Sequence, residues 1–133
     1  LIEAYIEEVV RLESPFKGHY RVVLNATHLG GVNLPAGARV FLQWAAANRD
    51  PSVFSLPDRL DPARHDGREH IGFGHGIHFC VGARLARMEA RIILEELLAS
   101  TEAFSLSEAE PVKHVPSIFV RRLECLHLAV TPS

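Results

Sequence analysis

The sequence has no long apolar run and no excess of positive charge. No stretch approaches the roughly 20 consecutive apolar residues that a membrane-spanning helix needs. The formal net charge of −2 over 133 residues gives no electrostatic basis for binding nucleic acid or an anionic membrane surface. No internal repeat or low-complexity segment is present. These absences leave one globular unit of ordinary composition, long enough to bury a single core.

Cysteine and methionine are both scarce. The only two cysteines, Cys80 and Cys125, do not make a disulfide framework, which favours an intracellular, cytoplasmic protein. The sequence lacks an initiator methionine and opens within a helical pattern, so we expect a fragment of a longer protein. Its first residues carry acid and no basic segment, so we do not expect a signal peptide.

Apolar residues at helical spacing predict two helices, at 1–13 and 83–99. The first ends at Ser14-Pro15, because the residue before a proline is pushed out of the helical region. Alanine-rich residues 43–48 predict a short helix, and β-branched and aromatic residues predict short strands. These strands are expected at 20–24, 32–34, 39–41, 117–121 and 125–130. Between 49 and 70 the density of proline excludes a long helix or a central strand, so we expect a loop held by arginine side chains.

The most distinctive stretch is a glycine-rich loop that places Cys80 just before the second long helix. The loop contains three glycines and two phenylalanines: Gly74, Gly76, Gly82, Phe73 and Phe79. The glycines let the backbone approach a flat ligand closely, and the phenylalanines can pack beside a large apolar ring. Unsatisfied N–H groups at the start of the helix favour thiolate over thiol. A soft anionic sulfur in such a loop suits iron, so we interpret Cys80 as the axial ligand of a haem iron.

Other interpretations of this loop are open at this point. The set His70, His75, His78 and Cys80 could bind zinc, although no second ligand pair of the C-x2-C kind is present. Cys80 could instead be a nucleophile with His78 as its base, or a buried cysteine in a glycine turn. A phosphate-binding loop is disfavoured because G-x-x-x-x-G-K-[ST] is absent. We expect Cys125 to be a small packing residue in a strand.

Two charged features outside the loop each have two interpretations. Glu8 and Arg11 lie three residues apart on one helix face, where they can form an ordinary surface ion pair or a buried one. Arg21 is a lone basic residue in an apolar strand, either as an edge-strand charge or as a ligand for an anion.

These motifs together resemble the bacterial cytochrome P-450 family of haem-thiolate monooxygenases. Phe73–Gly82 fits the family's haem-binding signature F-G-x-G-x-H-x-C-x-G, and Gly82–Arg87 resembles the G-A-x-L-A-R that follows it. Glu8–Arg11 matches its E-x-x-R. Ala47–Pro51 and Pro57–Asp61 resemble two further segments in the right order. Small departures are Arg84 in place of a common proline and Val81 in place of a common leucine.

The resemblance implies a fold, a cofactor and roles for individual residues. The fold would be mainly α with small β-sheets, with residues 1–133 a single partial domain, the C-terminal third of the cytochrome P-450 fold. Cys80 would be the catalytic proximal ligand of haem b. The haem contacts would be Arg21, Phe73, Gly74, His78, Cys80, Gly82 and Ala86, with Arg21 and His78 at the propionates. Glu8 and Arg11 would pair with Arg59 to hold the proline-rich segment under the loop.

The resemblance also implies partners and leaves alternatives. The complete protein would insert one oxygen atom of O2 into a small organic substrate, with electrons from a ferredoxin-type donor and its reductase. Arg64, Arg68, Arg84 and Arg87 could form a basic face for that donor. The family's oxygen-activating helix would lie upstream of Leu1. The alternatives are a truncated, non-catalytic remnant with weak or no haem binding, or a small His/Cys zinc module.

Overall fold

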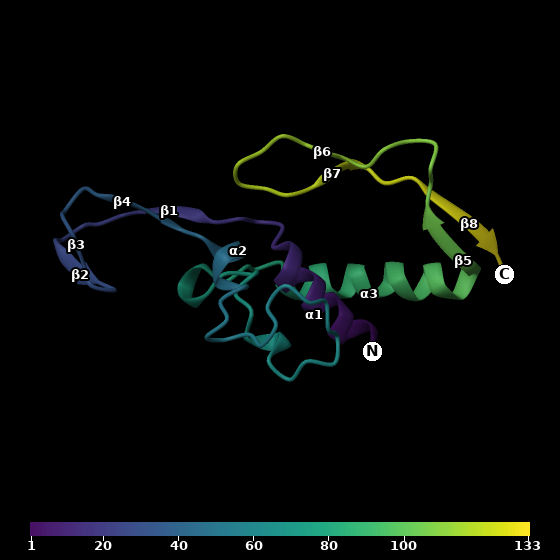
Figure 1. Cartoon of the computed structure of the whole chain (residues 1–133), viewed down its shortest axis with the longest axis horizontal. Helices are drawn as coiled ribbons and strands as arrows, with labels where there is room; N and C mark the ends of the chain where they lie inside the picture. The colour runs from purple at the N-terminus through teal and green to yellow at the C-terminus, as the bar shows by residue number, and fades with distance from the viewer.

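The computed structural model describes all 133 residues as an elongated molecule (Figure 1). Two β-hairpins lie at one end, the helices and the irregular segment lie in the middle, and a two-stranded sheet lies at the other end beside the C-terminus. The helices are α1 (Ile2–Glu13), α2 (Trp44–Ala47) and α3 (Ala83–Ser100), with short 3₁₀ turns η1 (Gly67–Glu69) and η2 (Gly76–His78). The strands are β1 (His19–Val22), β2 (Thr27–Leu29), β3 (Val32–Leu34), β4 (Arg39–Leu42), β5 (Thr101–Leu106), β6 (Lys113–His114), β7 (Leu123–Cys125) and β8 (Leu128–Pro132).

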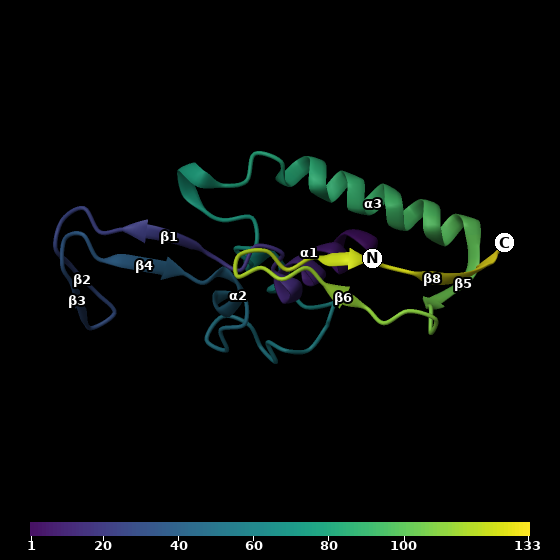
Figure 2. The ribbon, with the colours of Figure 1, turned by 90° about the horizontal axis from the view of Figure 1, so that it is seen from above.

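Helix α1 ends where the sequence predicts, and the structure shows how. Ser14 takes a left-handed conformation with φ of 40°, and its N–H donates to the Val10 carbonyl at 3.0 Å. Its hydroxyl donates to the Arg11 carbonyl at 2.9 Å, which satisfies a second orphan acceptor of the last turn. The helix packs against α3, which runs beside it in both views (Figures 1 and 2).

Helix α3 begins directly after Gly82 and continues without a loop into β5. The Thr101 hydroxyl donates to the Leu97 carbonyl at 2.7 Å, which closes the helix as the backbone turns extended. Strand β5 pairs antiparallel with β8, so the end of α3 is tied to the C-terminus. The sequence patterns located the helix but did not separate β5 from the loop that follows it.

The eight strands form four separate two-stranded ladders, β1–β4, β2–β3, β5–β8 and β6–β7. The strand expected at 117–121 is wrong: only an isolated bridge from Phe16 to Val120 is present. The Ser117 hydroxyl accepts the N–H groups of Phe119 and Val120 at 3.2 and 3.1 Å, which bends this stretch into a turn. The run expected at 125–130 is divided between β7 and β8.

The buried interior of this chain is small and mostly polar. Of 133 residues 11 are buried, and only Ile6, Phe54 and Ala83 among them are hydrophobic. Among the largest fully buried side chains are Arg11, Glu8 and Asn48. The irregular segment 49–70 wraps around this polar centre and contains only the short turn η1, in agreement with its proline content. No helix is both long and apolar enough to cross a membrane.

Candidate functional site

The loop before α3 is held in shape by its own backbone. The Cys80 N–H donates to the Phe73 carbonyl at 2.8 Å, so the two ends of the loop are joined. Between them Gly74 and Gly76 have φ of 77° and 68°, a left-handed conformation that glycine adopts without steric cost. The Phe79 N–H donates to the Gly76 carbonyl at 3.0 Å and closes η2. The loop therefore presents Cys80 from a fixed backbone.

Cys80 is exposed at the start of α3, in a setting that is apolar and rich in N–H donors. Its carbonyl accepts the Ala83 N–H at 3.2 Å, whereas the N–H groups of Val81 and Gly82 donate no hydrogen bond. Four exposed apolar side chains surround this end of the helix: Ile77, Phe79, Val81 and Leu85. A Cβ on Gly82 would lie 3.9 Å from the Cys80 sulfur, so the glycine keeps this side of the thiol open. The thiol is free, without a disulfide partner.

Phe73, at the other end of the loop, is fixed by its neighbours on α3. The Arg87 guanidinium lies over the Phe73 ring, 4.4 Å from its centroid, within the range of a cation–π contact. The Phe79 ring lies at a tilt, with the two centroids 6.5 Å apart. Arg87 in turn donates two hydrogen bonds to Glu7 on α1, at 2.5 and 2.7 Å. A continuous set of contacts thus runs from α1 through α3 to the loop.

Glu7 is the buried acid at the centre of that set. Burial raises the pKa of Glu7, but the hydrogen bonds from Arg87 and His70 outweigh it, so the pKa lies below its usual range. The His70 Nε2 lies 3.0 Å from the second Glu7 oxygen. The hydrogen bond to Glu7 in turn raises the pKa of Arg87. The sequence pattern did not single out Glu7; its position next to Glu8 was the only signal.

Arg11 and Glu8 form a buried pair, which decides between the two interpretations of their spacing. Their side chains are 0% and 1% exposed, and two hydrogen bonds of 2.7 and 2.8 Å join them. Arg11 also donates to the carbonyl oxygens of Asn48 at 2.8 Å and Pro57 at 2.7 Å. A weaker bond of 3.3 Å reaches the carbonyl of Arg59. One side chain of α1 therefore binds three points of the chain from the end of α2 to residue 59.

Arg64 takes the position in this network that the sequence interpretation gave to Arg59. The Arg64 Nε donates to Glu8 at 3.0 Å, and its Nη1 donates to Asp66 at 2.7 Å. The Arg59 side chain is exposed, and the residue contributes only its carbonyl oxygen. Burial raises the pKa of Glu8, but the hydrogen bonds from Arg11 and the Asp61 N–H outweigh this effect, so the pKa lies below its usual range. Spacing along the chain could not tell which arginine of an irregular loop turns inward.

Asn48 is a second residue that the sequence interpretation did not single out. Its amide group donates to the Ser14 hydroxyl at 3.0 Å, and its side-chain oxygen accepts the Ile71 N–H at 2.8 Å. Asn48 thereby joins the end of α1 to the residue that enters the loop. Its only signal was its place directly after the short alanine-rich helix.

The other predicted residues lie on the surface and do not touch one another. Arg21 is exposed on β1, with its guanidinium bonded to the Tyr20 carbonyl at 2.9 Å. His78 is exposed in η2, and Ala86 is exposed one turn into α3. The zinc alternative at this loop is not supported, because the donor atoms of His70, His75, His78 and Cys80 do not converge.

Only two of the four arginines that were expected to form a basic face are exposed and free of ion pairs. Arg64 is 4% exposed and pairs with Glu8 and Asp66, and Arg87 pairs with Glu7. Arg68 and Arg84 remain exposed and outside any ion pair.

A recess of about 670 Å³ lies between α1, the loop and α3, and its lining includes Phe73, Phe79 and Met88 but not Cys80.

Comparison with known proteins gives the family. The model of the cytochrome P450 family matches residues 1–122. Cytochrome P450 144 of Mycobacterium tuberculosis is 52% identical over 130 residues, which are 98% of this chain and 30% of that protein. The erythromycin C-12 hydroxylase of Saccharopolyspora erythraea is 46% identical over 99 residues, 74% of this chain and 25% of that protein. The chain therefore belongs to the cytochrome P450 family.

The solved structures agree with the sequence relatives. The substrate-free cytochrome P450 CYP150A6 of Mycobacterium marinum superimposes with a TM-score of 0.95 at 34% identity, covering 99% of this chain and 34% of that one. The chain therefore has a P450 fold over about a third of the length of that solved structure.

Proposed function

We propose that this chain is the haem-binding end of a haem-thiolate monooxygenase, with Cys80 as the ligand of the iron. The observation that carries the proposal is the exposed thiol of Cys80, fixed by the Phe73 bond and surrounded by exposed apolar side chains. A thiolate donor in an apolar setting fits an iron porphyrin, whose ring is large, flat and hydrophobic. Haem b is the form we propose, since it needs no covalent attachment beyond this ligand.

Several residues in and next to the loop have a specific role in haem binding under this proposal. Cys80 supplies the sulfur, and the free N–H groups of Val81 and Gly82 lie where they can stabilise its negative charge. Phe73, Gly74, Gly82 and Ala86 line the proximal side of the ring. When bound, haem supplies the iron at which O2 is activated and one oxygen atom is passed to a substrate.

The exposed side chains of Arg21 and His78 are proposed to bind the two propionates. A carboxylate accepts charge-assisted hydrogen bonds from a guanidinium or imidazolium group. In this structure the Arg21 guanidinium donates a hydrogen bond to the neighbouring Tyr20 carbonyl. The remaining contacts hold the segments around the loop in place. Glu8 and Arg11 fix the irregular segment, and Glu7 with Arg87 fixes Phe73.

The proposed partners follow from the same class of enzyme. Electrons would come from a ferredoxin-type donor with its reductase, and exposed Arg68 and Arg84 are the basic groups available to an acidic partner. The substrate would be a small organic molecule. Two relatives are named for such substrates: one is an erythromycin C-12 hydroxylase, and the other is a steroid C26-monooxygenase.

The test is the carbon monoxide spectrum of the complete, haem-loaded protein. We expect the Soret band of the reduced, CO-bound protein to lie at the position typical of thiolate ligation. Cys80→Ala should abolish that band, because no other thiol lies in the loop, whereas Cys125→Ser should leave it unchanged. A thiolate-type band that persists in Cys80→Ala would contradict the proposal.

A further inference from the structure

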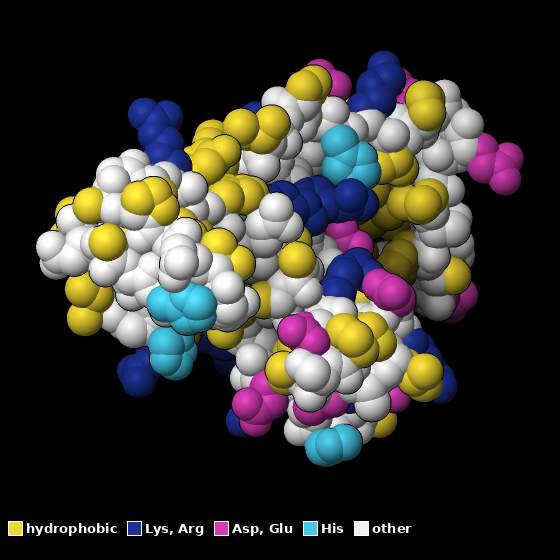
Figure 3. All heavy atoms as spheres, turned by 60° about the vertical axis from the view of Figure 1, so that its left-hand side comes forward, with side chains coloured by type: hydrophobic (Ala, Val, Ile, Leu, Met, Phe, Trp, Pro, Cys, Tyr) yellow, Lys and Arg dark blue, Asp and Glu magenta, His cyan; other side chains and the backbone are white.

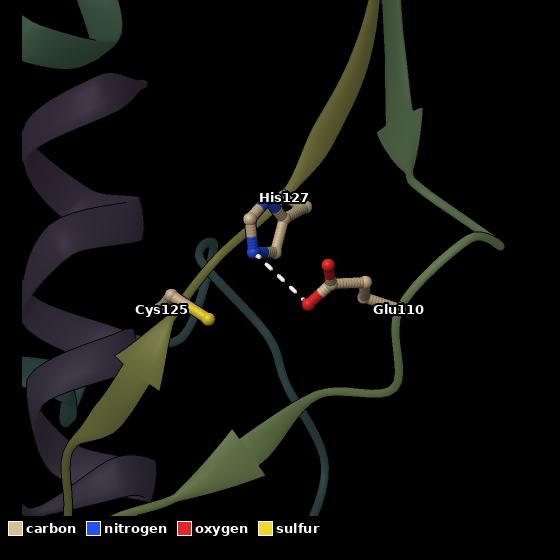
Figure 4. Close-up of side chains that lie close together, drawn as sticks. All are labelled: Glu110, Cys125 and His127. Atoms are coloured by element: carbon tan, nitrogen blue, oxygen red, sulfur yellow. Dashed lines mark ion pairs between the residues drawn. The ribbon is translucent and has the colours of Figure 1, made fainter.

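Three metal-binding side chains converge outside the haem loop, in the C-terminal part of the chain (Figure 4). They are Glu110, Cys125 and His127, and their potential ligand atoms all lie within 4.8 Å of one another. The His127 Nε2 lies 3.5 Å from a Glu110 oxygen. The sequence interpretation took Cys125 as a packing residue, but its side chain is exposed and its thiol is free.

The pairing of two ladders brings these residues together. The Ser107 N–H donates to the His127 carbonyl at 3.0 Å at the end of the β5–β8 ladder. Lys113 pairs in register with Cys125 in the β6–β7 ladder. The turn that carries Glu110 is therefore held at both ends by the segment that contains the cysteine and the histidine. Its carboxylate is placed over them by main-chain bonds and not by the side-chain contact alone.

Cys125 is the last residue of β7, and His127 lies in the short connection just before β8. Figure 4 shows both pointing toward Glu110 across the gap between the strands. Lys113, which pairs with Cys125 in the β6–β7 ladder, forms no ion pair with Glu110, so the carboxylate is shared only with His127. All three side chains are open to the surface, which gives a metal ion a path of entry.

We propose that Glu110, Cys125 and His127 form a binding site for Zn²⁺. Ligand atoms on a tetrahedral zinc with one sulfur lie about 3.3–3.7 Å apart, given Zn–N bonds of about 2.0–2.1 Å, Zn–O bonds of about 2.0–2.2 Å and a Zn–S bond of about 2.3 Å. The observed His127–Glu110 separation of 3.5 Å already falls in this range. Thiolate, imidazole and carboxylate together are a donor set that zinc accepts, with a fourth position left for water.

Binding would exchange one proton for the metal, at Cys125. The S–H bond of Cys125 breaks, its proton passes to solvent, and a sulfur–zinc bond forms. The His127 ring binds as neutral imidazole through the lone pair of Nε2, with its single ring proton on Nδ1. The thiolate and the carboxylate balance the two positive charges of the ion. No oxidation or reduction takes part.

The test measures zinc on the complete, haem-loaded protein, with a chromophoric chelator as competitor. Unmodified protein should bind one zinc ion at this site, and X-ray absorption at the zinc edge should show one sulfur at about 2.3 Å. Glu110→Gln, Cys125→Ser and His127→Ala should each weaken binding about tenfold or more through loss of one ligand. Glu108→Gln and His114→Ala, exposed neighbours outside the cluster, are the matched controls and should change the affinity less than about twofold.

A second measurement needs no variant. Zinc should protect Cys125 from alkylation by iodoacetamide, read by peptide mass, while the haem-ligated thiol stays unreactive in both conditions. The proposal is overturned if zinc binds equally well to Cys125→Ser, if the controls weaken it as much as the ligand variants, or if no zinc binds. A Cys125 that resists alkylation without zinc would be covered in the complete protein and would overturn it as well. The haem spectrum reports separately on Cys80, so failure of one site is distinguishable from failure of the other.

Discussion

His70 shows how the protonation of one buried side chain is coupled to the shape of the loop that carries Cys80. Its Nδ1 accepts the Gly72 N–H at 3.1 Å, so the proton of the neutral ring must sit on Nε2, where it faces Glu7. Burial lowers the pKa of His70, and the nearby charges of Arg87 and Arg11 lower it further, against the opposing effect of Glu7. A second proton would place an N–H group against the Gly72 N–H and break the bond at the loop entrance.

We predict that stability falls as the pH drops below about 6.5, the ordinary pKa of histidine. The folded pKa of His70 lies below that value, so the unfolded chain binds the proton more readily in this range. The lowered pKa of Glu7 acts in the same direction at more acid pH, below its ordinary 4.5. Urea unfolding of the complete protein at several pH values, followed by circular dichroism, measures this.

His70→Gln keeps a donor toward Glu7 but does not titrate, so its stability should change less between pH 7.5 and 5.5 than that of the unmodified protein. His114→Gln, on the exposed strand β6, is the matched control and should keep the original profile. Equal pH profiles for His70→Gln and the unmodified protein would show that the ring carries no part of the pH dependence.

At the level of elements, α1 is the part that holds the irregular segment in place. Segment 49–70 has no sheet of its own, and bonds from side chains on α1 hold it in place. Glu8 accepts the Asp61 N–H at 3.0 Å, and Arg11 binds the Pro57 carbonyl. The guanidinium groups of Arg11 and Arg64 both lie near the Phe54 ring, at 5.1 and 5.9 Å from its centroid. The loop that carries Cys80 follows this segment and depends on its position.

Arg11→Ala should therefore destabilise the complete protein by about 3–5 kcal/mol, because it removes one partner of a buried ion pair and leaves three carbonyl oxygens without their donor. Arg11→Lys keeps the charge but loses the planar fork, so it should recover only part of the loss. Arg39→Ala, an exposed arginine on β4 outside any ion pair, should cost less than about 0.5 kcal/mol. Chemical unfolding and haem retention measure all three. A cost for Arg11→Ala as small as that for Arg39→Ala would contradict this account.

At the level of the whole molecule, the chain leaves many large hydrophobic side chains at its surface. Leu85, Met88, Ile92 and Ile93 on α3 are all exposed, and Figure 3 shows hydrophobic side chains spread across much of one face. The chain spans about 30% of the length of its relative cytochrome P450 144. We infer that the rest of the P450 fold covers these surfaces, since exposed apolar area on this scale marks a contact surface.

The 133-residue chain produced alone should associate with itself, bind a hydrophobic dye and take up haem weakly. Under the proposed function it supplies only one side of a haem pocket, and its large hydrophobic side chains are exposed. Light scattering and a haem titration measure this, with the complete protein as the control. A monomeric chain that binds one haem tightly and turns over substrate would show instead that the remaining part of the fold is dispensable.

Local patterns in the sequence determined the two long helices, the irregular segment and the position of Cys80, because helical periodicity, proline and glycine act within a few residues of each other. Only the tertiary structure decided that Arg64 and not Arg59 reaches Glu8, that Asn48 ties α1 to the loop, and that β5 exists as the partner of β8. These contacts join residues 22 to 56 positions apart, from the Leu106–Leu128 pair to the Glu8–Arg64 bond. Which residues come into contact depends on the path of the folded chain. Such contacts produce no periodic pattern in the sequence, so the sequence alone does not predict them.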